Sequence, residues 1–242
     1  MNISVCLATY NGEKYIEEQL RSIIDQLIEG DELLILDDCS TDNTLEVIKK
    51  IDSRFIRIHE NNTNVGHVKT FEKLITMTKN EYIFLSDQDD IWNANKRKTF
   101  LQVFESKDNV SVITSNMDYI DNIGNKLEFD TFKIVTSNSS KYYKNILDIF
   151  LGKSLYYGST MAFRKELKSI ILPFPSCLES HDIWIGLIAN FVNGNYFIES
   201  KTLFRRLHEN NVTKNNRTFL KRIYSRYIFL RNIFEILKRL NK

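Results

Sequence analysis

The stretch Leu85-Ser86-Asp87-Gln88-Asp89-Asp90-Ile91-Trp92 places three carboxylates within four residues, directly after the apolar segment Tyr82–Leu85. A short apolar run of this kind indicates a buried strand. Carboxylates packed so closely repel one another unless a cation or a protonation event relieves the repulsion. A buried strand that ends in this way predicts a metal-diphosphate site, and therefore an enzyme that handles a nucleotide-linked substrate.

Length and composition limit the alternatives. The chain has 242 residues, of which 43% are hydrophobic and 26% charged, so it can bury the core of one large domain with or without an appendage. Cys6, Cys39 and Cys177 are odd in number and form no Cys-x-x-Cys pair, which favours a reducing compartment. We expect a cytoplasmic protein without a signal peptide or membrane span, so that any work at a membrane takes place from its surface.

The charge is distributed unevenly along the chain. From Lys214 onward, Lys and Arg outnumber the single acid, Glu235, by eight. Because the whole chain carries +2, the remainder carries about −6. An acidic body argues against general nucleic-acid binding, which requires a cationic surface over the folded domain.

Strand-like and helix-like segments alternate through the first ninety or so residues. Helical spacing predicts helices over Glu13–Leu27, from Ser40 or Thr41 as N-cap through Lys50, and over about Gly66–Thr78. Apolar runs predict strands at Ile3–Ala8, Leu33–Leu36, Phe55–His59 and Tyr82–Leu85. This alternation predicts an α/β fold with a Rossmann-like, mainly parallel central sheet flanked by helices, and a ligand crevice at the carboxyl ends of the strands.

The second half is less regular. It predicts a strand at 110–114, a hairpin and polar loop over 116–138, a strand over Tyr157–Phe163, and a helix that begins near Glu179–Asp182 and ends at Val192.

Four motifs together carry a family resemblance. In order and spacing, they resemble family 2 glycosyltransferases with the GT-A fold over residues 3–213. The segments 87–92, 181–184 and 206–212 are most similar to bacterial rhamnosyltransferase-like members that build surface polysaccharides. The four motifs are Ser4–Gly12, Asp37–Asp42, Ser86–Asp90 and Ser180–Asp182. The resemblance implies a GT-A domain over residues 1–212. The pattern of the remaining residues, 213–242, predicts a basic amphipathic helix.

The resemblance also implies roles for the acidic and loop residues. Asp87 and Asp89 would bind Mg²⁺ or Mn²⁺, for which hard oxygen ligands are suited. The residues implied to bind the nucleotide are Thr9, Tyr10, Asn11, Asp38 and Asp87. Ordinary structural roles compete with these: an acidic helix N-terminus for the cluster at 87–90, and turn formation or capping for Asp37, Asp38 and Asp42.

Asp182 is the candidate general base of an inverting displacement, and its competing role is to cap the helix that follows. The other residues implied to contact donor, acceptor or diphosphate are Asp90, Trp92, His181, Arg206 and His208. A solvated strand edge is the competing expectation for Arg205 and Arg206. Trp184 is expected in the core.

The implied activity is the transfer of one sugar from a nucleotide-diphosphate donor of the UDP or dTDP type to a glycan or lipid-linked glycan acceptor. A processive polymer synthase is disfavoured because the chain has no Gln-x-x-Arg-Trp motif. Two other classes stay open: a nucleotidyltransferase that forms sugar nucleotides, and a non-catalytic carbohydrate-binding assembly protein. The first should carry a glycine-rich, basic phosphate loop after its first strand, which Thr9–Glu13 is not.

The C-terminal tail carries an apolar stripe flanked by Lys and Arg. The stripe consists of Ile223, Tyr227, Leu230, Phe234 and Leu237, spaced alternately by four and three residues. Such a helix suits the anionic inner surface of a membrane, where the protein would be peripheral. The stripe is equally suited to pack on the enzyme's own core or on a second subunit of a homodimer.

Overall fold

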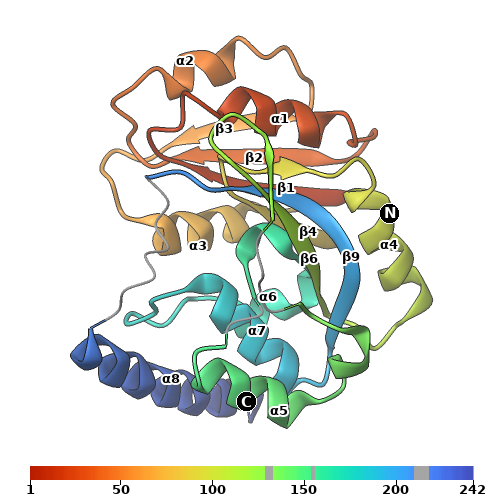
Figure 1. Ribbon diagram of the computed structural model, residues 1–242, viewed down its shortest axis with the longest axis vertical. Coiled ribbons are helices and arrows are strands. Elements are labelled where there is room, and N and C mark those ends of the chain that lie inside the picture. The colour runs from red at the N-terminus through yellow and green to blue at the C-terminus, as the bar shows by residue number, and fades with distance from the viewer. Residues whose placement is uncertain (129–132, 154–155, 210–217, 242) are drawn as a thin grey trace.

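The computed structural model describes residues 1–242 except 129–132, 154–155, 210–217 and 242. Its described residues form a mixed α/β body around a curled sheet of nine strands (Figure 1). The strands are β1 (Ile3–Thr9), β2 (Glu32–Asp37), β3 (Ile56–Glu60), β4 (Tyr82–Ser86), β5 (Ile91–Trp92), β6 (Val112–Ile120), β7 (Lys126–Leu127), β8 (Met161–Arg164) and β9 (Asn195–Arg206). The helices are α1 (Ile16–Ile24), α2 (Thr44–Lys49), α3 (His67–Met77), α4 (Lys96–Ser106), α5 (Tyr142–Phe150), α6 (Lys168–Ile171), α7 (His181–Phe191) and α8 (Phe219–Leu240), with 3₁₀ turns η1 (Thr136–Asn138), η2 (Gly158–Thr160) and η3 (Lys165–Leu167).

The strand order is β3-β2-β1-β4-β8-β6-β9-β5, and β7 pairs with β6 beside this path. Strands β1 to β4 are parallel, as the alternation of strands and helices predicts. Strand β8 is antiparallel to both β4 and β6, whereas β6 and β9 run parallel and β5 is antiparallel to β9. The predicted α/β fold class is confirmed, with a parallel first half and a mixed second half.

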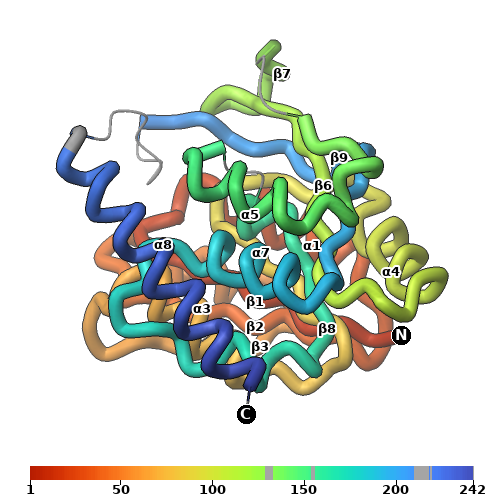
Figure 2. Tube along the Cα trace, turned by 90° about the horizontal axis from the view of Figure 1, so that it is seen from below, coloured from red at the N-terminus to blue at the C-terminus, as the bar shows by residue number. Residues whose placement is uncertain are grey.

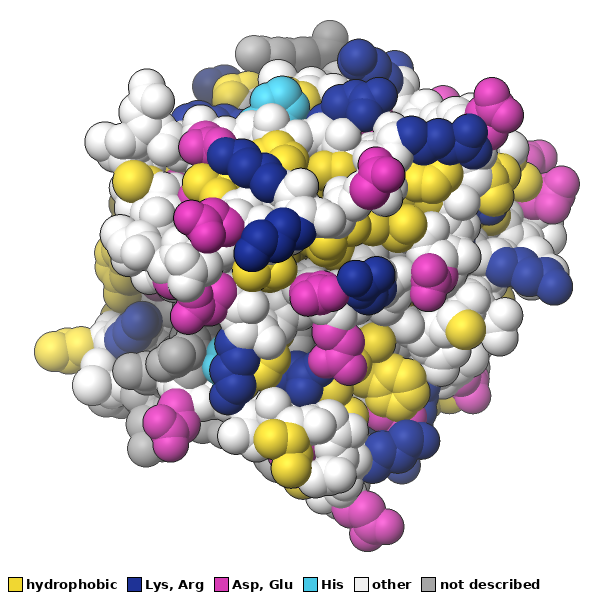
Figure 3. Space-filling model, turned by 90° about the horizontal axis from the view of Figure 1, so that it is seen from above, with side chains coloured by type: hydrophobic (Ala, Val, Ile, Leu, Met, Phe, Trp, Pro, Cys, Tyr) yellow, Lys and Arg dark blue, Asp and Glu magenta, His cyan; other side chains and the backbone are white. Residues whose placement is uncertain are grey.

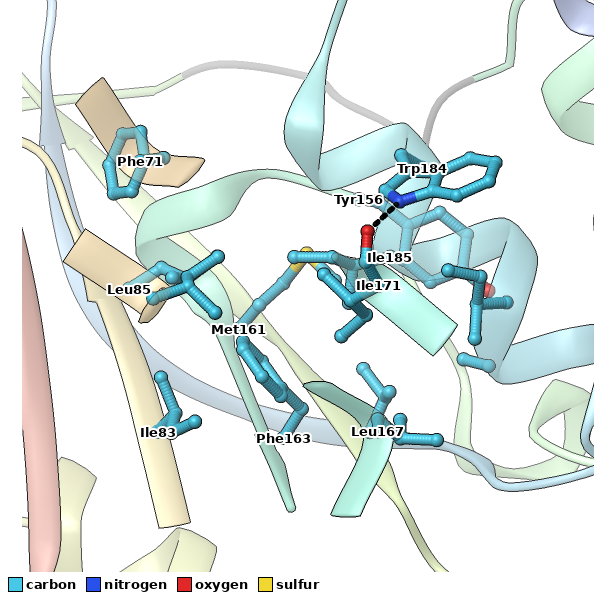
Figure 4. Packing of buried hydrophobic residues seen from close by; sticks show 14 of the residues in the cluster. Phe71, Ile83, Leu85, Tyr156, Met161, Phe163, Leu167, Ile171, Trp184 and Ile185 are labelled. Atoms are coloured by element: carbon cyan, nitrogen blue, oxygen red, sulfur yellow. Dashed lines mark hydrogen bonds between the residues drawn. The ribbon is translucent and has the colours of Figure 1, made fainter. Parts of the chain in front are cut away.

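Alternating strand residues bury two apolar clusters, one on each face of the sheet. Val5 and Leu33 join a cluster with α1, α2 and α4, whereas Cys6 and Leu34 join a cluster with α3 and α5 to α8. Figure 1 shows these groups of helices on opposite faces of the sheet. In the second cluster Trp184 is fully buried and its Nε1 donates to the carbonyl oxygen of Ile171 at 3.0 Å (Figure 4). The expectation that Trp184 lies in the core is confirmed.

The helices and strands predicted in the first half all form, although α2 begins later than predicted. Helix α2 begins at Thr44 after Asn43, so Ser40 and Thr41 do not cap it. Ser40 instead donates its backbone N–H and its hydroxyl to the carboxylate of Asp37. In the second half, the strand predicted from Tyr157 begins only at Met161, because residues 158–160 form η2 with Thr160 N bonded to Tyr157 O.

Strand β9 was not predicted, and it overturns one expectation. Arg206 lies at the end of β9, between β6 and β5 in the sheet order, and is only 2% exposed. A solvated strand edge is therefore wrong for Arg206. Strands β6 and β7 form the predicted hairpin, whereas residues 129–132 of the predicted polar loop lie outside the described residues.

Helix α8 packs against α6 and α7 through a face that includes Phe229 and Ile236, both buried. The predicted apolar stripe lies on a different face and is exposed, so packing of the stripe on the enzyme's own core is wrong. Within the described residues, no helix combines the length and apolar character needed to cross a bilayer. The predicted boundary between residues 212 and 213, with Lys214 and Arg217, lies outside the described residues.

Basic and acidic side chains are interspersed on the face that Figure 3 shows, and neither sign forms a continuous field there. This face therefore offers no extended cationic surface for nucleic acid.

Gly186 allows α7 to approach the buried ring of Tyr156. A Cβ at this position would lie 2.6 Å from two ring carbons, and the ring, only 1% exposed, has no free space to move into. We predict that Gly186→Ala lowers the free energy of unfolding by about 1–3 kcal/mol, because overpacking a dense core strains it. Urea unfolding measures the change. Glu105→Ala, at an exposed position of α4, is the control; equal effects of the two substitutions would contradict the prediction.

Candidate active site

Three carboxylates follow the buried strand β4, and residues of η2 and of the segment at the end of β9 hold them. Asp87 accepts a hydrogen bond from the hydroxyl of Ser159 in η2 at 2.7 Å. Asp89 pairs its Oδ2 with Nε2 of His208 at 2.8 Å. Asp90 accepts from the backbone N–H of Arg206 at 3.1 Å. Elements distant in sequence therefore converge on the residues that the sequence singles out.

Burial and mutual repulsion dominate the electrostatics of this cluster. Burial raises the pKa of Asp90 to about 8, and the negative charges of Asp89 and Asp87 add to the effect. Burial and Asp89 likewise raise the pKa of Asp87. The fully buried Lys96 lies behind the cluster, where burial lowers its pKa to about 7 against the opposing attraction of Asp90 and Asp87. The guanidinium of Arg205 opposes both shifts, and the pKa values of Asp87 and Asp90 are raised in spite of it.

Arg206 and His208 enclose the acidic segment from β9. The guanidinium of Arg206 donates to the carbonyl oxygen of Asp89 at 3.1 Å and to the carboxylate of Glu18 at 2.5 Å. The ring of Tyr15 lies 4.8 Å from this guanidinium and 4.9 Å from the imidazole of His208. The structure therefore brings together Asp89, Asp90, Arg206 and His208.

Gln88 ties the loop after β1 to the acidic segment. Its side-chain oxygen accepts from the Thr9 hydroxyl and from the backbone N–H of Tyr10, each at 2.7 Å, and its amide donates to the carbonyl of Tyr10 at 3.0 Å. A Cβ on Gly12 would lie 2.4 Å from the same oxygen, so a side chain at this position would displace the amide of Gln88. The loop predicted to bind the nucleotide is thus fixed against the loop predicted to bind the cation.

A second set of bonds fixes the loop after β2. Asn11 adopts a left-handed conformation (φ 49°); its N–H donates to the Ser40 hydroxyl, and its side-chain oxygen accepts from the N–H of Thr41, each at 2.8 Å. Asp38 is 4% exposed and accepts three hydrogen bonds, from Asn61 Nδ2 at 2.9 Å and from the N–H groups of Val65 and Gly66 at 2.9 and 2.8 Å. Asp38 therefore shapes the loop that leads into α3.

Asp182 lies in the first turn of α7, and its electric field reaches the acidic cluster. Its Oδ1 accepts hydrogen bonds from the hydroxyl of Ser180 and from the N–H of Ile183. After burial and Asp89, the negative charge of Asp182 also raises the pKa of Asp87. Burial, Tyr119 and Asp182 together raise the pKa of Tyr157, whose ring lies 4.8 Å from the guanidinium of Arg205. Asp182 therefore shares one electrostatic environment with the acids at the end of β4.

Two predicted contact residues lie in the interior. Trp92 is 3% exposed and packs against Phe84 and Lys96. Its side chain therefore does not reach a substrate, and the predicted contact is wrong. His181 stacks on Phe71 with ring centroids 4.0 Å apart, and neither of its nitrogens has a hydrogen-bond partner among the described residues. Burial lowers the pKa of His181 to about 4, so its imidazole is neutral near pH 7.

The donor set is suited to a divalent cation. Asp89 supplies a carboxylate and His208 an imidazole at its side, and Asp87 and Asp90 place two further carboxylates close to Asp89 in the chain. No cluster of three or more ligand side chains occurs among the described residues. Proteins commonly bind Mg²⁺ through only one or two side chains, while substrate phosphates and water supply the other ligands.

Sequence reasoning missed several residues of this region. Gln88 carries no charge and was passed over between two acids, although its place inside the motif could have drawn attention to it. Lys96 was missed because lysine is almost never fully buried. Ser159 and Tyr157 belong to a segment predicted as a strand, so no signal placed their side chains beside the carboxylates.

Comparisons with known proteins agree with this geometry. The chain is 32% identical to the dTDP-rhamnosyl transferase RfbG of Shigella flexneri, over 93% of this chain and 79% of the relative. It is 31% identical to the UDP-Glc:alpha-D-GlcNAc-diphosphoundecaprenol beta-1,3-glucosyltransferase WfgD of Escherichia coli, over 50% of this chain and 47% of the relative. The fold resembles S. aureus TarS 1-349 in complex with UDP-GlcNAc, with a TM-score of 0.72 and 23% identity, over 98% of this chain and 67% of that one.

The sequence model of "Glycosyl transferase family 2" matches residues 4–170, well over half of the chain. With the RfbG relationship and the GT-A-like fold, this match leads to one conclusion: the chain belongs to glycosyl transferase family 2.

Proposed function

We propose that this glycosyltransferase is metal-dependent and inverting, and that it moves one sugar from a UDP- or dTDP-linked donor to a glycan or lipid-linked glycan acceptor. The pathway is the synthesis of a surface polysaccharide. One arrangement supports the proposal: η2 and the segment after β9, both far from the acids in the chain, bring Ser159 to Asp87 and His208 to Asp89.

The donor site consists of the loops after β1 and β2. Tyr10 is 45% exposed and Asn11 is exposed, so both can meet a nucleotide, whereas Thr9 is buried and holds Gln88. The carboxylate of Asp38 can accept about four hydrogen bonds and already accepts three within the protein. One acceptor position is left for an N–H of the nucleotide base. The named donors of the relatives, dTDP-rhamnose-type for RfbG and UDP-linked for WfgD, support a pyrimidine nucleotide.

Asp89 and His208 would hold the cation, with Asp87 beside them. When bound, the cation neutralises the charge that develops on the departing diphosphate. Arg206 does not approach the diphosphate as a free cation, because Asp89, Asp121 and Glu18 already occupy its guanidinium. Its role is to hold the acidic segment in place.

Asp182 would act as the general base. The acceptor hydroxyl oxygen attacks the anomeric carbon and loses its proton to the carboxylate, while the bond to the diphosphate breaks and its electron pair leaves with the nucleotide. One displacement inverts the anomeric centre. Both hydrogen bonds of Asp182 within the described residues end on Oδ1, which leaves Oδ2 for the acceptor proton.

A nucleotidyltransferase is the weaker alternative, because the loop after β1 contains no glycine-rich, basic phosphate cradle. Its backbone at Tyr10 is engaged by Gln88 instead. A non-catalytic carbohydrate-binding protein would need neither the cation pair nor the base. Thermal stabilisation by a panel of nucleoside diphosphates with Mn²⁺ distinguishes donor bases, because ligands that bind the folded state raise its stability.

We predict that Asp182→Asn lowers the rate of sugar transfer by about 10²–10⁴-fold, because the amide cannot accept the acceptor proton. Stabilisation by nucleoside diphosphate and Mn²⁺ should be unchanged, since the donor loops are intact. Transfer from radiolabelled donor measures the rate. Asp108→Asn, an exposed acid after α4, is the matched control. Transfer at the wild-type rate by Asp182→Asn would assign the base elsewhere.

We predict that Asp89→Asn and His208→Ala each raise the Mn²⁺ concentration needed for half-maximal donor binding by about tenfold or more, because each removes a ligand or the partner that orients it. Calorimetric titration of nucleoside diphosphate at several Mn²⁺ concentrations measures this requirement. His59→Ala removes an exposed histidine of β3 and should leave the Mn²⁺ requirement unchanged. If all three variants share the wild-type requirement, the cation lies at another place.

We predict that Asp90→Asn stabilises the metal-free protein increasingly as pH rises from about 4 to about 8. The raised pKa of Asp90 means that the folded protein binds this proton more tightly than the unfolded chain. Ionisation therefore destabilises the wild type across that range, whereas the amide does not ionise. Melting temperatures in EDTA at several pH values measure the effect, with Asp108→Asn as control. A gain that is largest at low pH would contradict the assignment.

A further inference from the structure

Helix α8 has two apolar faces, and the described residues cover only one of them. Phe229 and Ile236 point into the protein, and Arg239 anchors the same side through the carbonyl oxygens of Ile170 and Pro173, each at 2.7 Å. On the opposite side five large side chains are between 43% and 72% exposed. They are Ile223, Tyr227, Leu230, Phe234 and Leu237, called the outer stripe below.

Cations flank the outer stripe along both edges. At about 3.6 residues per turn, Arg231 and Lys238 fall at one edge and Arg222 and Arg226 at the other. Among the described residues, the ion pairs do not involve Arg222, Arg231 or Lys238, and the single acid of the helix, Glu235, is paired with Arg239. The outer stripe is therefore an apolar surface within a field of uncompensated positive charge.

We propose that the outer stripe of α8 docks on an anionic lipid surface, with the helix lying in the plane of the membrane interface. The apolar side chains would enter the boundary between headgroups and acyl chains, while the flanking cations meet anionic headgroups. A second copy of this helix is a poorer occupant, because pairing two such faces would bring like charges together along both edges.

The position of α8 relative to the site fits this occupant. The hydroxyl of Ser225 donates to Glu179 at 2.8 Å, and Glu179 lies three residues before Asp182. Figure 1 shows that α8 begins on the side of the molecule where β9 ends, and β9 leads directly to His208. Figure 2 shows α8 along the outside of the molecule. A docked helix would therefore hold the segment that carries the base close to the lipid surface.

Lipid docking does not depend on the proposed transfer reaction, so the two can fail separately. The test is co-sedimentation of the full chain with phosphatidylcholine vesicles, with and without phosphatidylglycerol, at low and high salt. We expect binding to the anionic vesicles that weakens with salt, because surface charge attraction is screened. Leu230→Ser/Phe234→Ser should weaken binding by about tenfold or more, since it removes two apolar anchors.

Two further variants complete the design. Arg222→Gln/Arg231→Gln should weaken binding to anionic vesicles while leaving the outer stripe intact. Ile28→Ser, 49% exposed in the turn before β2, is the control for loss of an exposed apolar side chain and should bind as wild type. All four substituted positions of the test variants are exposed, so melting temperatures should stay close to that of the wild type.

Several outcomes would overturn the proposal. One is wild-type protein that stays in the supernatant with anionic vesicles at low salt. Another is equal binding by wild type and Leu230→Ser/Phe234→Ser. A third is a wild-type dimer in sedimentation velocity that this double variant converts to monomer without any loss of lipid binding, which would make the outer stripe a contact between copies. Sugar transfer to a soluble acceptor, measured in parallel, reports separately on the catalytic proposal.

Discussion

The crowding of three carboxylates at the end of β4, where Asp90 is buried and Asp87 and Asp89 are half-buried, is the constraint on which the rest of the site depends. Asp87 and Asp90 lie where burial opposes their charge, and each neighbouring acid increases that opposition. The fold supplies each acid with one contact: the Ser159 hydroxyl of η2 for Asp87, the His208 imidazole for Asp89, and the backbone N–H of Arg206 for Asp90. These contacts fix the positions of the acids, and the cation that we propose to bind here would relieve the repulsion among them.

The mixed half of the sheet brings β9 next to the acidic segment that follows β4. Its pairing with β6 is irregular between Ser115 and Asn116 and again between Asn116 and Asp118. Irregularities of this kind bend a strand and increase its twist, and they are common next to active sites. Beyond them β9 pairs with β5, the two-residue strand that directly follows the acidic segment. The pairing of Ile91 with Phe204 thus sets Arg206 beside Asp89 and Asp90.

The sequence predicts the first half of the fold well because its signals are local. Ile3–Ala8, Leu33–Leu36 and Tyr82–Leu85 are short apolar runs that end in turns, and the helices between them keep a regular apolar period. Strand β9 has no such signal, since Glu199, Ser200 and Lys201 interrupt its apolar residues. Its position is decided by pairing with β6, whose residues lie about eighty positions earlier in the chain. Long-range pairing of this kind is invisible to local periodicity.

Within the site, the motifs predict which residues gather but not what each one contacts. Thr9 and Asp38 were identified as nucleotide contacts, yet in the fold their polar atoms bind Gln88 and the loop before α3. These internal hydrogen bonds have one physical reason. A loop that is already rigid loses little conformational entropy when a ligand binds, so its affinity for the ligand is higher. Side chains next to a ligand are therefore often engaged with backbone. If the proposed donor site is correct, Thr9 and Asp38 serve it through the loops they hold.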